Sequence, residues 1–203
     1  AQCAAVNCQE ILDLNPSATD GVYTIDPDAD GLLLRDAYCD MSTDGGGWTK
    51  LGSAQYPFFF SPASWDQYGL PEDANFVYLT DLDDFAVNGT YTLRYVVGSS
   101  TDWLDVREHY TVWSQDHNPF TSSTNGSDYV YIAGEESTTC NGFNGLHHNY
   151  QGYSRATDVD SSDSYGCWWQ QVIPIAYYNW NPPGYLEGYD GPNTHTWQSI
   201  WVR

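Results

Sequence analysis

The sequence contains very few basic residues and a single lysine. Among its 203 residues, 27 Asp and Glu oppose 6 Lys and Arg, which gives a formal net charge of -21. A surface this acidic repels phosphate groups, so nucleic acid is a poor partner. The sequence also lacks any run of about 18 apolar residues, the length that a membrane-spanning helix requires. We therefore expect neither nucleic-acid binding nor membrane insertion.

The sequence motifs of several enzyme classes are also missing. There is no G-x-S-x-G nucleophile motif, no H-E-x-x-H zinc motif and no phosphate-binding loop. A glycosidase needs two carboxylates about 5 to 10 Å apart, but nothing in the sequence singles out such a pair. A zinc hydrolase built on His147 and His148 would need a third ligand at a recognisable spacing, and neighbouring strand residues point to opposite faces. We expect the protein not to be an enzyme.

Aspartate and aromatic residues are abundant. Aromatic residues make up 16% of the chain, which argues against disorder, because highly charged disordered segments are poor in them. Aspartate favours turns and provides oxygen ligands for cations. The composition therefore predicts one loop-rich globular domain with β-structure that needs a divalent cation to tolerate its charge.

Five cysteines stand at positions 3, 8, 39, 140 and 167. None forms a C-x-x-C pair, so a structural zinc site is not expected. Spaced cysteines and few lysines suit an oxidising compartment, and we expect a secreted, extracellular protein. The absence of Met at position 1 is consistent with a cleaved signal peptide or with a shortened chain. Four cysteines can pair in three ways, and the fifth is left over.

Alternating apolar residues and turn residues predict the secondary structure along the chain. We expect a short helix at 8–13, strands at 21–25, 37–41, 48–51, 91–97, 130–133 and 197–202, and either strand or helix at 103–113. Residues 53–75 are expected to form a long loop, and 136–165 an irregular stretch. An irregular stretch of that length in a compact domain is usually functional or held by ions and disulfides.

The first part of the chain carries a specific motif. A cysteine at position 8 is followed by Gly21-Val-Tyr-Thr-Ile25 and then by Tyr38-Cys-Asp-Met-Ser-Thr-Asp-Gly-Gly-Gly-Trp-Thr49. This order resembles the opening of a fibrinogen-related domain, and Thr92-Leu-Arg-Tyr95 resembles a core strand of that family. The resemblance implies a single α+β domain over 1–203 with short twisted β-sheets, few short helices and long calcium-stabilised loops. Residues 1–52 would form an N-terminal subdomain, and 53–203 the sheet core with calcium- and ligand-binding loops.

The same resemblance bears on the disulfides. In the family the two cysteines of the opening motif form a bridge, which supports the pairing of Cys8 with Cys39. For the remaining cysteines we favour a bridge between Cys140 and Cys167. Cys3 is then the odd thiol, either free or linked to a second chain in a homo-oligomer, which would increase avidity.

The C-terminal part resembles two branches of the family. Fibrinogens and ficolins of vertebrates carry an Asp-rich calcium loop followed by a cysteine and two tryptophans, and Tyr153 to Trp169 is similar to that order. Intelectins (X-type lectins) carry an N-x-x-H-H cation site, an acidic ligand farther on and a spaced Trp–Tyr pair. Here Asn144-Gly-Leu-His-His148, Asp158, Trp180 and Tyr189 fall at similar spacing. The chain is much shorter than the vertebrate intelectins and lacks most of their cysteines.

The intelectin resemblance implies a calcium ion that takes part in sugar binding. Ca²⁺ takes six to eight oxygen ligands, and vicinal hydroxyls of a sugar can fill positions that the protein leaves open. An aromatic ring beside the ion would cover the apolar side of the sugar. The implied metal ligands are Glu135, Glu136, Asn144, His147, Asp158, Asp160 and Asp163. The implied ligand-binding residues are His147, Trp180, Tyr185 and Tyr189.

The region has alternative interpretations. His147 and His148 also fit an ordinary exposed loop pair, and 158–163 also fits a solvated acidic turn or a purely structural calcium site. For the whole protein we expect a secreted, calcium-dependent, intelectin-like lectin that binds terminal glycan diols on cell-surface or microbial glycans. The alternatives are a ficolin-like binder of acetylated glycans with structural calcium, and a protein-binding adhesion module.

A second acidic sequence lies at Asp26-Pro-Asp-Ala-Asp-Gly31. It resembles the first half of an EF-hand loop, but Ala37 stands where the twelfth position requires Glu, and Pro27 disagrees with such a loop. We interpret it as a hairpin turn, and the alternative is a weak cation site.

Overall fold

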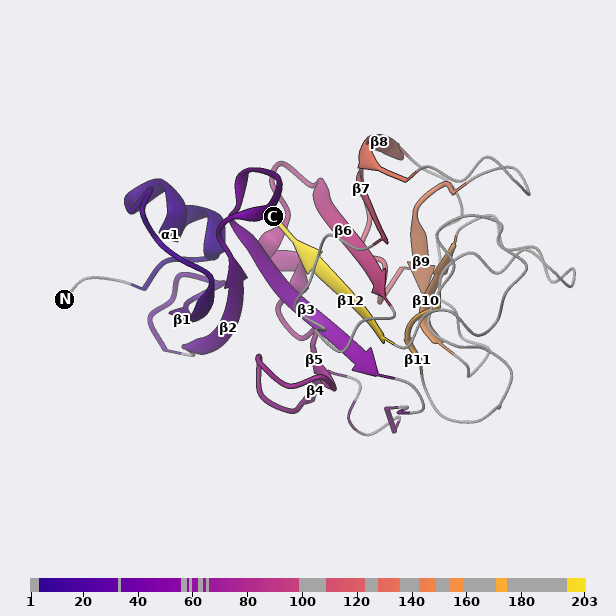
Figure 1. Cartoon of the computed structure of the whole chain (residues 1–203), viewed down its shortest axis with the longest axis horizontal. Helices are drawn as coiled ribbons and strands as arrows, with labels where there is room; N and C mark the ends of the chain where they lie inside the picture. The colour runs from indigo at the N-terminus through magenta and orange to yellow at the C-terminus, as the bar shows by residue number, and fades with distance from the viewer. Residues whose placement is uncertain are drawn as a thin grey trace, which may run out of the picture.

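The computed structural model describes residues 4–32, 34–55, 58, 60–61, 64, 66–98, 109–122, 128–135, 143–148, 154–158, 171–174 and 197–203. Within these residues a nine-stranded antiparallel sheet runs through the molecule, and a small three-stranded sheet lies at one end of it (Figure 1). One α-helix lies at the opposite end, beside the first two strands (Figure 1). No helix in this part of the chain is long and apolar enough to cross a membrane.

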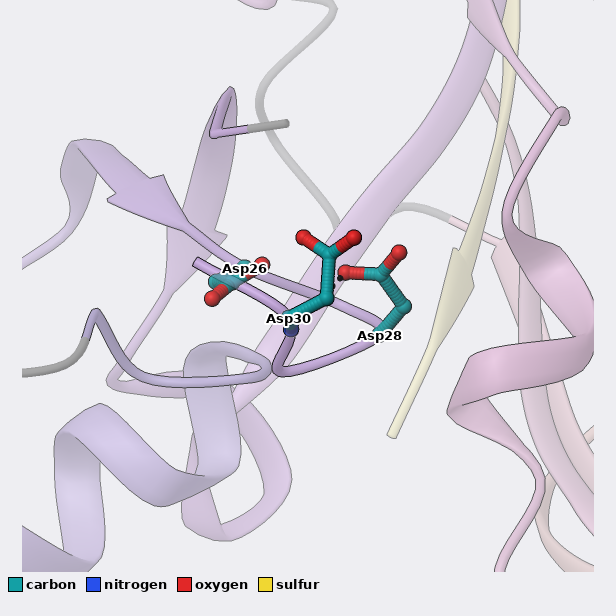
Figure 2. A group of neighbouring side chains, drawn as sticks. All are labelled: Asp26, Asp28 and Asp30. Atoms are coloured by element: carbon teal, nitrogen blue, oxygen red, sulfur yellow. Dashed lines mark hydrogen bonds between the residues drawn. The ribbon is translucent and has the colours of Figure 1, made fainter. Parts of the chain in front are cut away.

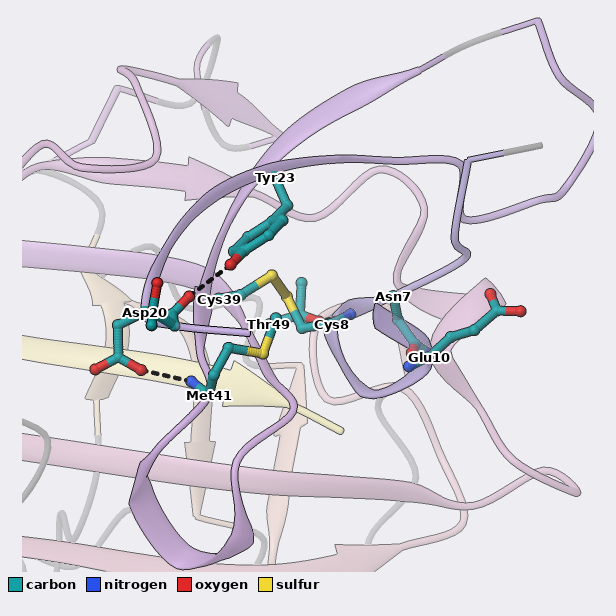
Figure 3. The surroundings of a disulfide bond; sticks show 9 residues. Asn7, Cys8, Glu10, Asp20, Tyr23, Cys39, Met41 and Thr49 are labelled. Carbon is teal, nitrogen blue, oxygen red and sulfur yellow. Dashed lines mark hydrogen bonds between the residues drawn. A yellow bond between two sulfur atoms is a disulfide. The ribbon is translucent and has the colours of Figure 1, made fainter. Parts of the chain in front are cut away.

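The N-terminal segment consists of a helix and a hairpin. The helix α1 (Cys8–Leu14) begins after Asn7, whose side chain accepts the backbone N–H of Glu10 at 2.9 Å and so caps the helix. Strand β1 (Gly21–Ile25) pairs with β2 (Arg35–Asp40) in an antiparallel hairpin. A disulfide between Cys8 and Cys39 joins the helix to the hairpin (Figure 3). The predicted pairing of these two cysteines is therefore confirmed.

The nine-stranded sheet brings the two ends of the chain together. Its order is β1-β2-β3-β12-β6-β7-β8, with β5 paired to β3 and β4 paired to β5. The C-terminal strand β12 (Trp197–Val202) lies between β3 (Trp48–Gln55) and β6 (Tyr91–Gly98). The other strands of this sheet are β4 (Gln67–Tyr68), β5 (Phe76–Tyr78), β7 (His109–Gln115) and β8 (Val130–Gly134). Among the described residues, the short 3-10 turns η1 (Thr43–Gly45) and η3 (Leu82–Phe85) connect strands.

The core covers both faces of the central strands. All six residues of β12 are buried, as are seven of the eight in β3. Along β6, Leu93 and Tyr95 belong to one apolar cluster and Val96 to another, because side chains alternate between the two faces of a strand. The second cluster is rich in tryptophan and contains Trp48, Trp197 and Trp201.

A buried ion pair crosses the tryptophan-rich cluster. Arg94 of β6 is fully buried, and its guanidinium lies 2.6 Å from the carboxylate of Asp40 in β2. The guanidinium carbon lies 4.6 Å from the ring centre of Trp48 and 5.1 Å from that of Trp201. Burial acts to raise the pKa of Asp40, but the charge of Arg94 and the backbone N–H of Thr43 outweigh it and hold this pKa below its usual range. The pair therefore stays ionised inside the fold.

The predicted strands at 21–25, 91–97, 130–133 and 197–202 and the helix at 8–13 are confirmed. For segment 103–113 the sequence is compatible with either a strand or a helix. Its described part, 109–113, lies in strand β7. Strand β3 continues to Gln55, three residues into the predicted loop 53–75, because it pairs there with β12 and β5. The predicted irregular stretch 136–165 contains two short strands, β9 (Leu146–His148) and β10 (Ser154–Asp158). Strands this short leave little periodicity in a sequence.

Candidate cation and ligand sites

The loop between β1 and β2 gathers three carboxylates. One oxygen from each of Asp26, Asp28 and Asp30 lies within 4.8 Å of the other two (Figure 2). In the described part of the chain, this is the one group of three or more His, Cys, Asp or Glu side chains that come close enough to hold a metal ion. The segment is a hairpin turn, as expected from the sequence, and its three carboxylates lie close enough together to hold a cation.

Local hydrogen bonds set the shape of this loop. The N–H of Ala29 donates to the carbonyl of Asp26 at 3.0 Å, and Ala29 takes a left-handed conformation with a φ of 56°. The carboxylate of Asp28 accepts the N–H of Asp30 at 3.2 Å, and that of Asp30 accepts the N–H of Leu32 at 2.7 Å. Aspartate forms such turns readily because its side chain reaches the backbone two residues on. The alternation Asp-x-Asp-x-Asp thus provides local hydrogen bonds that shape the loop.

Among the three aspartates, Asp26 is the one whose environment is set by the tertiary structure. It is fully buried, whereas Asp28 and Asp30 are exposed. Its Oδ2 accepts the N–H of Gly31 at 2.9 Å, but its Oδ1 accepts no hydrogen bond from the described residues. Its backbone N–H donates to the carbonyl of Ala5 at 2.8 Å. The loop is therefore tied to the segment that precedes α1.

More negative charge lies next to this loop. Burial raises the pKa of Asp84, and the charges of Asp81, Asp28 and Asp83 raise it further. Asp28 is thus close enough to the acidic turn η3 for the two to repel each other. A bound cation would relieve this repulsion.

The region predicted to bind calcium and sugar is anchored by a buried glutamine. Gln115, at the end of β7, is fully buried and makes two hydrogen bonds to the backbone of Leu146 in β9, each 3.0 Å long. Its side-chain oxygen also accepts the indole N–H of Trp113 at 2.8 Å. The Gln115 side chain therefore helps to dock β9 onto the main sheet. The sequence carried no signal for this role, because it depends on the burial of Gln115.

The small sheet places some of the predicted ligands on neighbouring strands. Its order is β11 (Gln171–Pro174), β10, β9. His147 lies opposite Thr157, and Leu146 lies opposite Asp158. Residues directly opposite each other share a face of an antiparallel pair, and neighbours along a strand alternate. Positions 148 and 158 therefore share one face, and position 147 belongs to the other.

The remaining predicted site residues and cysteines form two groups, those that the structure describes and those that it does not. Glu135 follows β8, and its carboxylate lies 2.8 Å from Nδ1 of His109, a partner that the sequence did not indicate. Asn144 precedes β9 and is half-buried. The other residues lie outside the described part of the chain: Glu136, Asp160, Asp163, Trp180, Tyr185, Tyr189, Cys3, Cys140 and Cys167. The ligand set in this region stays a prediction.

No protein-family model matches the chain. Tenascin of Gallus gallus is 33% identical to it over 92 residues, which is 43% of this chain and 5% of that protein. Tenascin-R of the same species is 33% identical over 85 residues, or 40% of this chain and 6% of that protein. The chain thus spans a small fraction of the length of these curated relatives.

Solved structures match almost the whole chain. The fibrinogen-like globe domain of human ANGPTL6 superposes with a TM-score of 0.56, covering 98% of this chain and 95% of that one. The chain has the fibrinogen-like globe fold. The corresponding domain of human ANGPTL2 gives a TM-score of 0.58 and covers 98% of both chains, and the sequence identity is 16% in both comparisons. The fold expected from the opening motif is therefore confirmed, as a mostly antiparallel sheet with a short helix.

Proposed function

We propose that this fibrinogen-like globe domain is an extracellular, non-catalytic binding module of the kind found in tenascins and angiopoietin-like proteins. The observation that carries the proposal is the match of the fold along 98% of the chain. The Cys8–Cys39 disulfide supports the extracellular setting, because such bridges persist in oxidising compartments.

The ligand that we propose is a terminal glycan carrying a vicinal diol, bound through Ca²⁺. The Asn144-Gly-Leu-His-His148 motif lies at β9, and Asp158 ends the strand beside it. This closeness supports an ion held on one face of the two paired strands. The register adds His148 to the candidates, because position 148 shares a face with position 158. Trp180, Tyr185 and Tyr189 would provide the aromatic wall.

A glycan array probed with and without a chelator tests this proposal. Binding to diol-bearing sugars should disappear with EDTA and return with Ca²⁺, and Trp180→Ala should abolish it. His147→Ala and His148→Ala form a matched pair, since they remove the same side chain from opposite faces of β9. If the ion lies on the face of position 158, His148→Ala weakens binding more than His147→Ala does.

Other outcomes would point to other functions. Binding to N-acetylated sugars that neither histidine variant nor EDTA affects would refute the diol-binding site and favour a ficolin-like recognition of acetyl groups. An array without any signal, together with binding to a purified extracellular protein, would favour an adhesion module.

A further inference from the structure

We propose that the loop Asp26–Gly31 is a calcium site in its own right, separate from the predicted sugar site, and that its ion fastens the N-terminal segment to the β1–β2 hairpin. We call this loop the hairpin cation site. The proposal does not rest on the proposed lectin function.

The distances within the loop suit one ion. Ca²⁺ binds oxygen at about 2.3 to 2.6 Å, so two oxygens on opposite sides of one ion lie about 4.6 to 5.2 Å apart. The three carboxylate oxygens of the hairpin cation site already lie within 4.8 Å of one another. These separations are compatible with one ion that contacts all three oxygens.

The buried oxygen of Asp26 is the second observation that points to a ligand. Burying an ionised carboxylate is costly unless the charge is paired and its oxygens are hydrogen-bonded. Oδ1 of Asp26 is buried and has no hydrogen-bond partner among the described residues. Among the same residues, the ion pairs involve Arg35, Arg94, His109 and His117, and none involves an aspartate of the loop. A cation bound beside Asp26 would supply the missing partner.

The surroundings make neutralisation more favourable still. Asp28 contributes to the raised pKa of Asp84, so the loop and the turn η3 already repel each other. The arginine of the hairpin, Arg35, forms an ion pair with Asp81 at 3.3 Å instead. In a chain with a net charge of -21, few other groups could provide the positive charge.

The donor atoms select the class of metal. Three carboxylates offer hard oxygen ligands, which suit Ca²⁺ and not the thiolate- and imidazole-binding metals. Mg²⁺ requires a near-ideal octahedron, whereas Ca²⁺ accepts irregular sites completed by water. The exposed side chains of Asp28 and Asp30 leave room for such waters. We expect a dissociation constant in the range of about 0.1 to 1 mM, as in other extracellular modules.

The site has a mechanical consequence for the N-terminus. Asp26 donates its N–H to Ala5, and Ala5 forms a parallel bridge with Ile25. Without an ion, repulsion among the three carboxylates opposes the loop conformation that holds this contact. Calcium should therefore order residues 4–6 and 26–32 together, even though they are distant in sequence.

Calcium counting and hydrogen exchange test the proposal on the full chain. The protein is stripped with chelator, and bound Ca²⁺ is measured by equilibrium dialysis at 2 mM Ca²⁺. We expect Asp28→Asn to weaken one site by about tenfold or more, because the number of charged ligands sets calcium affinity. Asp13→Asn is the matched control, since it removes an equal charge from the exposed end of α1. It should bind as much Ca²⁺ as the wild type.

Asp26→Asn is a second variant, and it should raise the melting temperature of the calcium-free protein. Asn can still accept the N–H of Gly31 but removes the buried charge, so the calcium-free protein should melt at a higher temperature than the wild type. Its melting temperature should rise less than that of the wild type when Ca²⁺ is added. Hydrogen exchange in 4–6 and 26–32 should slow with Ca²⁺ in the wild type and not in either variant.

Two results would overturn the proposal. One is an unchanged number of bound Ca²⁺ in both Asp28→Asn and Asp26→Asn, and the other is hydrogen exchange in 26–32 that does not respond to Ca²⁺ in the wild type. Neither result bears on sugar binding, which is read from the array with the histidine variants. The two proposals can therefore fail independently.

Discussion

The buried pair of Asp40 and Arg94 gives a prediction whose magnitude can be worked from the structure. In the wild type, the carboxylate of Asp40 accepts the N–H of Thr43 at 2.9 Å. Asp40→Asn removes the negative charge but keeps an oxygen that can accept this hydrogen bond. Arg94 is then left fully buried without a counter-ion. Breaking a buried ion pair in this way typically costs about 3 to 5 kcal/mol. In a domain of this size, each kcal/mol lowers the melting temperature by about 2 to 4 °C.

Urea denaturation followed by tryptophan fluorescence measures this loss, because the guanidinium lies against Trp48 and Trp201. Asp36→Asn is the matched control: it lies on the same strand but is exposed, so its effect should stay within about 0.5 kcal/mol. Adding Arg94→Met to Asp40→Asn should recover part of the loss, since no unpaired charge then remains. If Asp40→Asn costs no more than Asp36→Asn, the pair does not stabilise the fold as argued.

The pair also predicts a dependence on acid. The pKa of Asp40 is lower in the folded protein than its ordinary value. The stabilisation is therefore complete at pH values above the ordinary pKa and is lost as the pH falls through the lowered one. Wild-type protein should lose this contribution in acid, and Asp40→Asn should lack that part of the pH dependence.

Two further predictions concern the disulfide and the single lysine. Replacing both Cys8 and Cys39 by Ala should cost about 3 to 4 kcal/mol, because the bridge spans a separation of 31 residues and restricts the unfolded chain; an unchanged urea midpoint would contradict this. Burial lowers the pKa of Lys50 to about 7, although Asp73 and Glu72 oppose the shift. The unfolded chain then binds more protons than the folded one above that pH, so stability should rise from about pH 7 to pH 10. Denaturation midpoints at pH 7 and 9 should show this rise in the wild type and not in Lys50→Met, and equal rises would argue against the shift.

Much of the fold could be predicted from local patterns in the sequence. In the strands at 21–25 and 91–97, apolar and polar residues alternate or β-branched residues are frequent. The turn at 26–31 is rich in aspartate. Short-range chemistry therefore determines these elements. The opening motif resembled a fibrinogen-related domain, and both the fold and the Cys8–Cys39 bridge agree with that resemblance.

The tertiary structure decided what depends on residues distant in sequence. Strand β12 lies between β3 and β6, Gln115 bonds to β9, and Arg94 is buried against Asp40. Each of these contacts joins segments whose local sequence patterns do not indicate which other segment they pack against. The acidic loop shows the division most clearly. The spacing of Asp26, Asp28 and Asp30 was visible in the sequence and suggested a turn, with a cation site as the alternative. The burial of Asp26 and its backbone bond to Ala5 exist only in the folded chain, and our proposal of a cation site depends on them.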